Sequence, residues 1–157
     1  MRCSRIKAKL KQDKPALITV LHFTDPSLYE MVGLMGFDGI WMDMEHHGYG
    51  LVEGLHMMRG ARAGGTTDIV ARPAKGEFMR MGRMLEAGAQ GIMYPRCDSA
   101  KEAAEVVRWA KFAPQGERGI DMGNPDCPYL LTPMVDYLKK ANEETLIVIQ
   151  IEHERAL

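Results

Sequence analysis

The sequence has few cysteines, and none of them falls in a pattern that builds a structure. Its 157 residues include three cysteines. Cys3, Cys97 and Cys127 are far apart and form no CxxC pair. An odd number without a paired motif argues against a disulfide framework and against a zinc ribbon. We therefore expect a protein of a reducing compartment, the cytoplasm.

Long apolar runs and an excess of charge of one sign are also missing. No stretch reaches the ~18 apolar residues of a membrane-spanning helix, and residues 1–15 lack the apolar segment of a secretion signal. The 20 basic and 21 acidic residues give a net charge of -1, which provides no field that attracts nucleic acid or an anionic membrane. We expect neither as a partner. The basic start fits a transit peptide or a short amphipathic helix before Pro15, and the spacing of Ile6 and Leu10 favours the helix.

What the sequence does contain is the balance of a globular protein, with 46% hydrophobic and 26% charged residues. Apolar, β-branched runs alternate with segments of helical period. Strands are predicted at 16–23, 40–45, 68–71, 91–94 and 145–151, and helices at 28–35, 51–58, 78–85, 99–110 and 133–142. Between the last two helices, residues 112–132 are rich in glycine and proline and have no period. A loop of that length is usually functional or mobile.

Alternating strands and helices predict a parallel sheet with helices packed around it, either doubly wound or closed into a barrel. No glycine-rich phosphate motif follows the first strand. Charged residues lie at the carboxyl ends of the second, third and fifth strands, at Asp43 and His46, at Arg72 and at Glu152. Side chains at the carboxyl ends of parallel strands share one rim, which favours a (β/α)8 TIM barrel. Such barrels need about 250 residues, so we expect residues 1–157 to form one partial barrel domain that lacks its C-terminal part.

The second predicted strand carries the strongest functional signal. Trp41, Asp43 and Glu45 alternate with apolar residues, so an extended chain puts all three on one face. An ionised carboxylate is costly to bury without a partner. Carboxylates on an inner face therefore indicate a site that holds a cation, a metal or a substrate.

Four sequence blocks resemble the HpcH/HpaI aldolase family of metal-dependent pyruvate aldolases. They are GFDGIWMDMEHH, VARPAKGE, GIMYPRCDSAKEAAEVVRWAKFAPQGERGI and IVIQIEHERAL, in this order. The resemblance covers essentially the whole chain. It implies an oligomeric (β/α)8 barrel that cleaves or forms a carbon-carbon bond between pyruvate and an aldehyde, as 4-hydroxy-2-oxoheptanedioate aldolase and 2-keto-3-deoxy-sugar-acid aldolases do. The expected partners are a small 2-oxo acid, an aldehyde and further copies of the same chain.

The resemblance also implies roles for individual residues. His46 matches the family's catalytic histidine, which moves the proton of the substrate hydroxyl group, and Asp43 matches the carboxylate that orients and charges this histidine. Arg72 matches the arginine that binds the pyruvate oxygens through its planar fork. Gln150 matches a position beside the metal, where it positions water or substrate.

The expected cofactor is a divalent metal ion, Mg²⁺ or Mn²⁺, with Co²⁺ as an option. Glu152 matches the family's first metal ligand. The second carboxylate ligand follows the sixth strand in the family, beyond the last residue of this sequence. His22, His47 and His153 match no family role, and we expect them to make structural hydrogen bonds.

Two other functions remain open. A partial barrel has two open sheet edges, which favour a non-catalytic module that pairs with another chain. An acyl-CoA ester lyase of the same superfamily would share the barrel and the metal, but it needs a CoA-binding surface that the sequence does not reveal.

Overall fold

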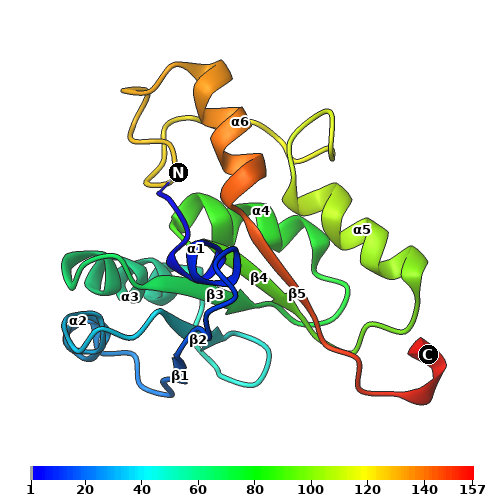
Figure 1. The fold of residues 1–157 in the computed structure, drawn as a ribbon, viewed down its shortest axis with the longest axis horizontal. Helices are drawn as coiled ribbons and strands as arrows, with labels where there is room; N and C mark the ends of the chain where they lie inside the picture. The colour runs from blue at the N-terminus through cyan, green and yellow to red at the C-terminus, as the bar shows by residue number, and fades with distance from the viewer. Residues whose placement is uncertain (1) are drawn as a thin grey trace.

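The computed structural model describes residues 2–157 and contains one parallel sheet with helices around it (Figure 1). The strands are β1 (Ile18–Val20), β2 (Gly39–Asp43), β3 (Asp68–Arg72), β4 (Gly91–Tyr94) and β5 (Leu146–Ile149). The helices are α1 (Arg5–Leu10), α2 (Pro26–Leu34), α3 (Leu51–Ala63), α4 (Phe78–Ala87), α5 (Ala100–Ala110) and α6 (Met134–Glu144), followed by the short 3₁₀ helix η1 (Glu154–Ala156). Among residues 2–157, no helix is both long and apolar enough to cross a membrane.

The order of the strands in the sheet follows their order in the chain, β1-β2-β3-β4-β5, and all neighbours are parallel. A doubly wound sheet would reverse its strand order at a switch point. The continuous order is that of a β/α barrel, which confirms the predicted fold class. β1 and β5 lie at the two edges of the sheet, so each pairs with a single neighbour among the described strands.

Two predicted strands are shorter than expected. The apolar run 16–23 forms a strand only at Ile18–Val20, because pairing with its single neighbour β2 ends where Val20 meets Trp41. The run 145–151 is a strand at Leu146–Ile149. There the backbone pairing goes one residue further, because the Gln150 amide donates to the Tyr94 carbonyl at 2.9 Å.

α3 passes through Gly54 and Gly60 without a break, although these glycines weaken its sequence signal. At Gly60 the reason is close packing, since a Cβ there would clash with the Pro26 carbonyl at the start of α2. At Gly54 a Cβ would meet only the flexible side chains of Met42 and Met44, the nearest atom at 3.5 Å. Gly60 is therefore required by the contact with α2, and Gly54 is not.

The main core fills the space between the sheet and helices α2 to α5. Apolar residues of β2 on the face away from the site, Ile40 and Met42, are fully buried in it, together with Met57 of α3 and Met81 of α4. This burial confirms the alternation predicted for the second strand. It leaves the opposite face of the strand for Trp41 and Asp43.

The amino ends of the strands are covered by α1 and the residue before it. Asp68, the first residue of β3, accepts hydrogen bonds from the Ser4 hydroxyl (2.7 Å) and from the Ile6 amide (2.9 Å). Asp38, just before β2, forms ion pairs with Arg5 and Lys9. α1 itself confirms the predicted short N-terminal helix. Its contacts cover the amino ends of these strands and leave their carboxyl ends as the open end of the sheet.

The long segment between α5 and α6 packs as a small core of its own. Phe112 and Cys127 are buried against Tyr137 and Ala141 of α6. Arg118 lies over the Phe112 ring, with its Cζ atom 4.5 Å from the ring centroid. The interior of this segment therefore helps to attach α6 to the rest of the fold.

Candidate functional site

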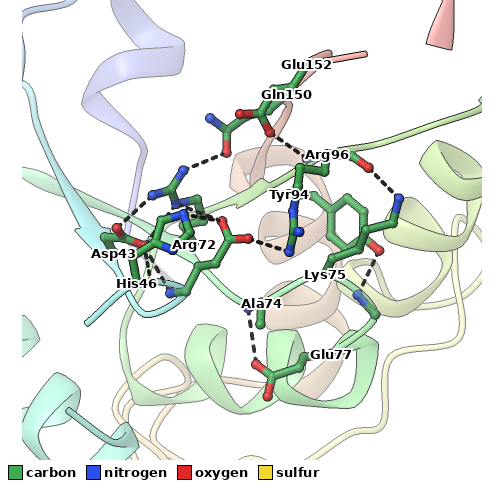
Figure 2. Close-up of polar contacts among 12 residues, drawn as sticks. Asp43, His46, Arg72, Ala74, Lys75, Glu77, Tyr94, Arg96, Gln150 and Glu152 are labelled. Atoms are coloured by element: carbon green, nitrogen blue, oxygen red, sulfur yellow. Dashed lines mark hydrogen bonds and ion pairs between the residues drawn. The ribbon is translucent and has the colours of Figure 1, made fainter. Parts of the chain in front are cut away.

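The site lies at the carboxyl ends of β2, β3 and β5, where Asp43, Arg72 and Gln150 converge (Figure 2). Asp43 and Arg72 are the last residues of neighbouring parallel strands and stand opposite each other in the register. Side chains paired in this way point to the same face of the sheet. The sequence expectation that these residues meet at one rim agrees with this placement.

Arg72 and Asp43 form a buried, two-pronged ion pair. The Arg72 Nε atom donates to Asp43 Oδ1 at 2.9 Å, and Nη2 donates to Oδ2 at 2.7 Å. Burial alone raises the pKa of Asp43, but the hydrogen bonds from Arg72 and from the Glu45 and His46 amides outweigh it and lower this pKa to about 2. The hydrogen bond to Asp43 also raises the pKa of Arg72. Both side chains are therefore charged at neutral pH.

Two further contacts fix the Arg72 guanidinium group. Its Cζ atom lies 4.6 Å from the centroid of the Trp41 ring, a cation-π contact. Its Nη1 atom donates to Gln150 Oε1 at 3.3 Å. A guanidinium carries five N–H groups, so one hydrogen on Nη1 and one on Nη2 remain after these bonds. Arg72 is thus held rigidly and keeps a free edge that can bind a carboxylate or keto oxygen.

The structure differs from the expected pairing of Asp43 with the His46 ring. The recorded contact between them is through the backbone, with the His46 amide 3.4 Å from Asp43 Oδ1. The Glu45 amide donates to the same oxygen, so the chain folds back over the carboxylate and turns the His46 side chain outward, where it is 66% exposed. Its Nε2 atom lies 3.6 Å from Glu45 Oε2. Asp43 therefore positions Arg72 rather than the His46 ring.

His47 lies closer to Asp43 than the ring of its neighbour does. Its Nε2 atom is 3.7 Å from Asp43 Oδ2. The ring also contacts the His22 ring at a centroid distance of 4.5 Å and stacks on Tyr49 at 6.2 Å. His153 has a local role, because its Nδ1 atom accepts a hydrogen bond from the Arg155 amide at the start of η1.

Sequence reasoning placed Glu45 on the face of the site without a specific role, and it missed Arg96. The buried Glu45 carboxylate lies between two guanidinium groups, with Oε1 2.8 Å from Arg96 Nη2 and Oε2 3.5 Å from Arg72 Nε. The alternation that placed Glu45 on the face of Asp43 was the available signal. For Arg96 the only signal was its position two residues after the fourth predicted strand, because its contacts depend on the conformation of the loop.

Glu152 lies at the rim, and its Oε2 atom accepts a hydrogen bond from the Arg96 amide at 2.8 Å (Figure 2). Within residues 2–157, no group of three or more histidine, cysteine or acidic side chains is arranged to hold a metal ion. One carboxylate is a poor site for Mg²⁺, which needs near-octahedral oxygen coordination. The described residues therefore do not form a metal site by themselves.

A model of the HpcH/HpaI aldolase/citrate lyase family matches residues 20–157. The chain belongs to this family. Its likeness extends to solved structures: a HpcH/HpaI aldolase from Desulfitobacterium hafniense superposes with a TM-score of 0.86 at 29% identity, over 96% of this chain and 57% of that one. The shared fold is of the TIM-barrel type.

Proteins named as aldolases are also similar at the level of sequence. A hydroxypyruvate/pyruvate aldolase from Sagittula stellata is 28% identical over 98% of this chain and 60% of its own length. A 4-hydroxy-2-oxo-heptane-1,7-dioate aldolase from Escherichia coli is also 28% identical, over 96% of this chain and 57% of its own length. The chain thus spans somewhat more than half the length of these relatives.

Proposed function

We propose that these residues belong to a metal-dependent aldolase that cleaves or forms the carbon-carbon bond between pyruvate and an aldehyde. The substrates would be 4-hydroxy-2-oxo acids or 2-keto-3-deoxy sugar acids. Family membership and the activities of the named relatives support this reaction class. The observation that carries the proposal is the buried Arg72–Asp43 pair, whose guanidinium keeps a free edge at the carboxyl end of the sheet.

Arg72 is proposed to bind the 2-oxo acid end of the substrate. In the cleavage direction, a base takes the proton of the C4 hydroxyl group, and the C3–C4 bond breaks. The bonding electrons pass into the pyruvate enolate, the aldehyde leaves, and protonation of C3 completes pyruvate. Two N–H groups fixed in advance beside the developing oxyanion stabilise the enolate more than the ground state. Gln150 would hold the guanidinium and contact the substrate beside it.

His46 is proposed as the group that takes the C4 hydroxyl proton. Its exposed imidazole has Nε2 3.6 Å from Glu45 Oε2, and the same carboxylate oxygen lies 3.5 Å from Arg72 Nε. An imidazole changes its protonation state near neutral pH, which suits a group that both takes and returns a proton. Asp43 contributes indirectly, because it fixes Arg72 and accepts a hydrogen bond from the His46 amide.

The metal is proposed for the whole protein and not for residues 2–157 alone. Glu152 would supply one carboxylate to Mg²⁺, Mn²⁺ or Co²⁺, and a further ligand would have to come from outside these residues. When bound, such a cation would stabilise negative charge on the enolate oxygen.

The assembly is also a proposal. We propose that residues 1–157 form one partial barrel domain that is completed by further strand-helix units. We also propose that the protein is a cytoplasmic homo-oligomer. Each of the edge strands β1 and β5 pairs with one neighbour among the described strands, which leaves its other edge available to additional strands and supports this proposal. The same edges support the second candidate function, a non-catalytic assembly module.

Pyruvate release from a 4-hydroxy-2-oxo acid tests the reaction. The full-length protein would be assayed by coupling pyruvate to lactate dehydrogenase, before and after removal of metal by a chelator. We expect release that stops with chelator and returns with Mn²⁺ or Mg²⁺. A folded full-length protein that releases no pyruvate with metal restored would favour the assembly module.

A further inference from the structure

Arg96 brings a second guanidinium group to the rim, from the segment that follows β4 (Figure 2). Its backbone has a φ of +46°, a left-handed conformation that residues with side chains seldom adopt. The Arg96 amide donates to Glu152, and its carbonyl accepts a hydrogen bond from Lys75 Nζ at 2.6 Å. An unfavourable backbone conformation that the surroundings hold in place is typical of functional sites.

The Arg96 guanidinium lies next to the group proposed to bind pyruvate. Its Nη2 atom is 2.8 Å from one oxygen of Glu45, whose other oxygen is 3.5 Å from Arg72 Nε. One carboxylate group therefore separates the two guanidinium groups. Arg96 is therefore the neighbouring guanidinium group on the rim, linked to Arg72 through Glu45.

The two arginines differ in how much of each remains available to a ligand. The Arg72 side chain is 9% exposed, and most of its N–H groups are used by protein partners. The Arg96 side chain is 58% exposed, and within residues 2–157 its recorded side-chain partner is Glu45 alone. A guanidinium carries five N–H groups, so this side chain can bind a further acceptor besides Glu45. A planar fork of this kind binds carboxylates in pairs of hydrogen bonds.

We propose that Arg96 is a specificity-determining residue that binds a second carboxylate, at the end of the substrate remote from the pyruvate carboxylate. The site would then select dicarboxylic 2-oxo acids over analogues with a neutral tail. The ligand class follows from the observed partner of Arg96, which is already a carboxylate. This inference rests on the proposed function, because Arg72 must hold the 2-oxo acid end.

The test is equilibrium binding of two matched ligands to the full-length protein in Mn²⁺, by isothermal titration calorimetry. 2-Oxoadipate and 2-oxohexanoate have the same chain length and differ in the distal carboxylate. We expect 2-oxoadipate to bind about 10-fold more tightly, because one charge-assisted pair of hydrogen bonds is gained. Arg96→Gln should remove this preference and leave the affinity for 2-oxohexanoate unchanged, and Arg96→Lys should restore part of it.

Arg80→Gln provides the control, because Arg80 is a partly exposed arginine of α4 that pairs with Glu77. It should keep the full preference. A wild-type protein without a preference, or an Arg96→Gln variant that weakens both ligands equally, overturns the inference. If both ligands bind in an Arg72-dependent way without a preference, only the role of Arg96 fails. If neither ligand binds the wild type, or Arg72→Lys has no effect, the proposed function fails too.

Discussion

Asp43 and Arg72 end neighbouring strands and join through two hydrogen bonds of 2.9 and 2.7 Å, and both side chains are buried. The pair sets the position of the Arg72 guanidinium, which contacts Asp43 at the end of β2 and Gln150 just after β5. Asp43 is therefore a positioning residue for Arg72, and both the stability of the fold and the proposed chemistry depend on it.

Asp43→Ala should destabilise the protein, because it leaves the Arg72 charge buried without its partner. Breaking a buried pair on one side costs about 3–5 kcal/mol. Asp98→Ala is the control, since the Asp98–Lys75 pair is partly exposed and screened by water, and its loss should destabilise the protein far less than the loss of Asp43. Urea unfolding of both variants measures the difference. Equal losses of stability would contradict the assigned importance of Asp43.

The contribution of Asp43 to stability should depend on pH. Its pKa is lowered to about 2 in the folded protein, below the value of an ordinary aspartate. A group whose pKa is lower in the folded state stabilises the fold above its unfolded pKa and loses this effect as the pH falls toward the folded pKa. The advantage of wild type over Asp43→Asn should therefore shrink by roughly 2 kcal/mol between pH 6 and pH 2. Urea titrations at several pH values would reveal it, and a difference independent of pH would count against a charged, paired Asp43.

The two adjacent histidines should behave differently. His46→Gln removes the proposed proton-transfer group and should lower kcat by about 10²-fold or more. His47→Gln removes a ring that packs on His22 and Tyr49, so we expect a loss of stability and a kcat that stays within about 5-fold of wild type. Steady-state kinetics on the full-length protein separates the two. A larger loss of kcat in His47→Gln would reassign the role to His47, the ring closer to Asp43.

Two glycines of one helix should respond in opposite ways to alanine. Gly60→Ala places a methyl group against the Pro26 carbonyl and should cost about 1–3 kcal/mol, as overpacking usually does. Gly54→Ala meets only flexible methionine side chains and should stabilise α3 by about 0.5–1 kcal/mol, because alanine favours helix. Thermal unfolding of the two variants measures the sign of each change in stability. Equal effects would mean that α2 and α3 do not approach as closely as the structure shows.

The convergence of Asp43 and Arg72 could be predicted from sequence, because strand order and alternation decide which rim and which face a residue occupies, and Gln150 was expected there from the family resemblance. The side-chain partner of Asp43, which is Arg72 and not the His46 ring, could not be predicted in this way. It depends on the backbone bonds from Glu45 and His46, which fold the chain back over the carboxylate and turn the His46 ring outward. Arg96 was missed for a similar reason, since its direction follows from a left-handed loop residue and not from a periodic pattern.

The direct test of the account is a crystal structure of the full-length protein with pyruvate bound. We predict that the pyruvate oxygens accept hydrogen bonds from Nη1 and Nη2 of Arg72, while Asp43 keeps its two bonds to the same guanidinium. Pyruvate bound away from Arg72, or an Arg72 side chain turned to the other end of the sheet, would contradict the proposed function.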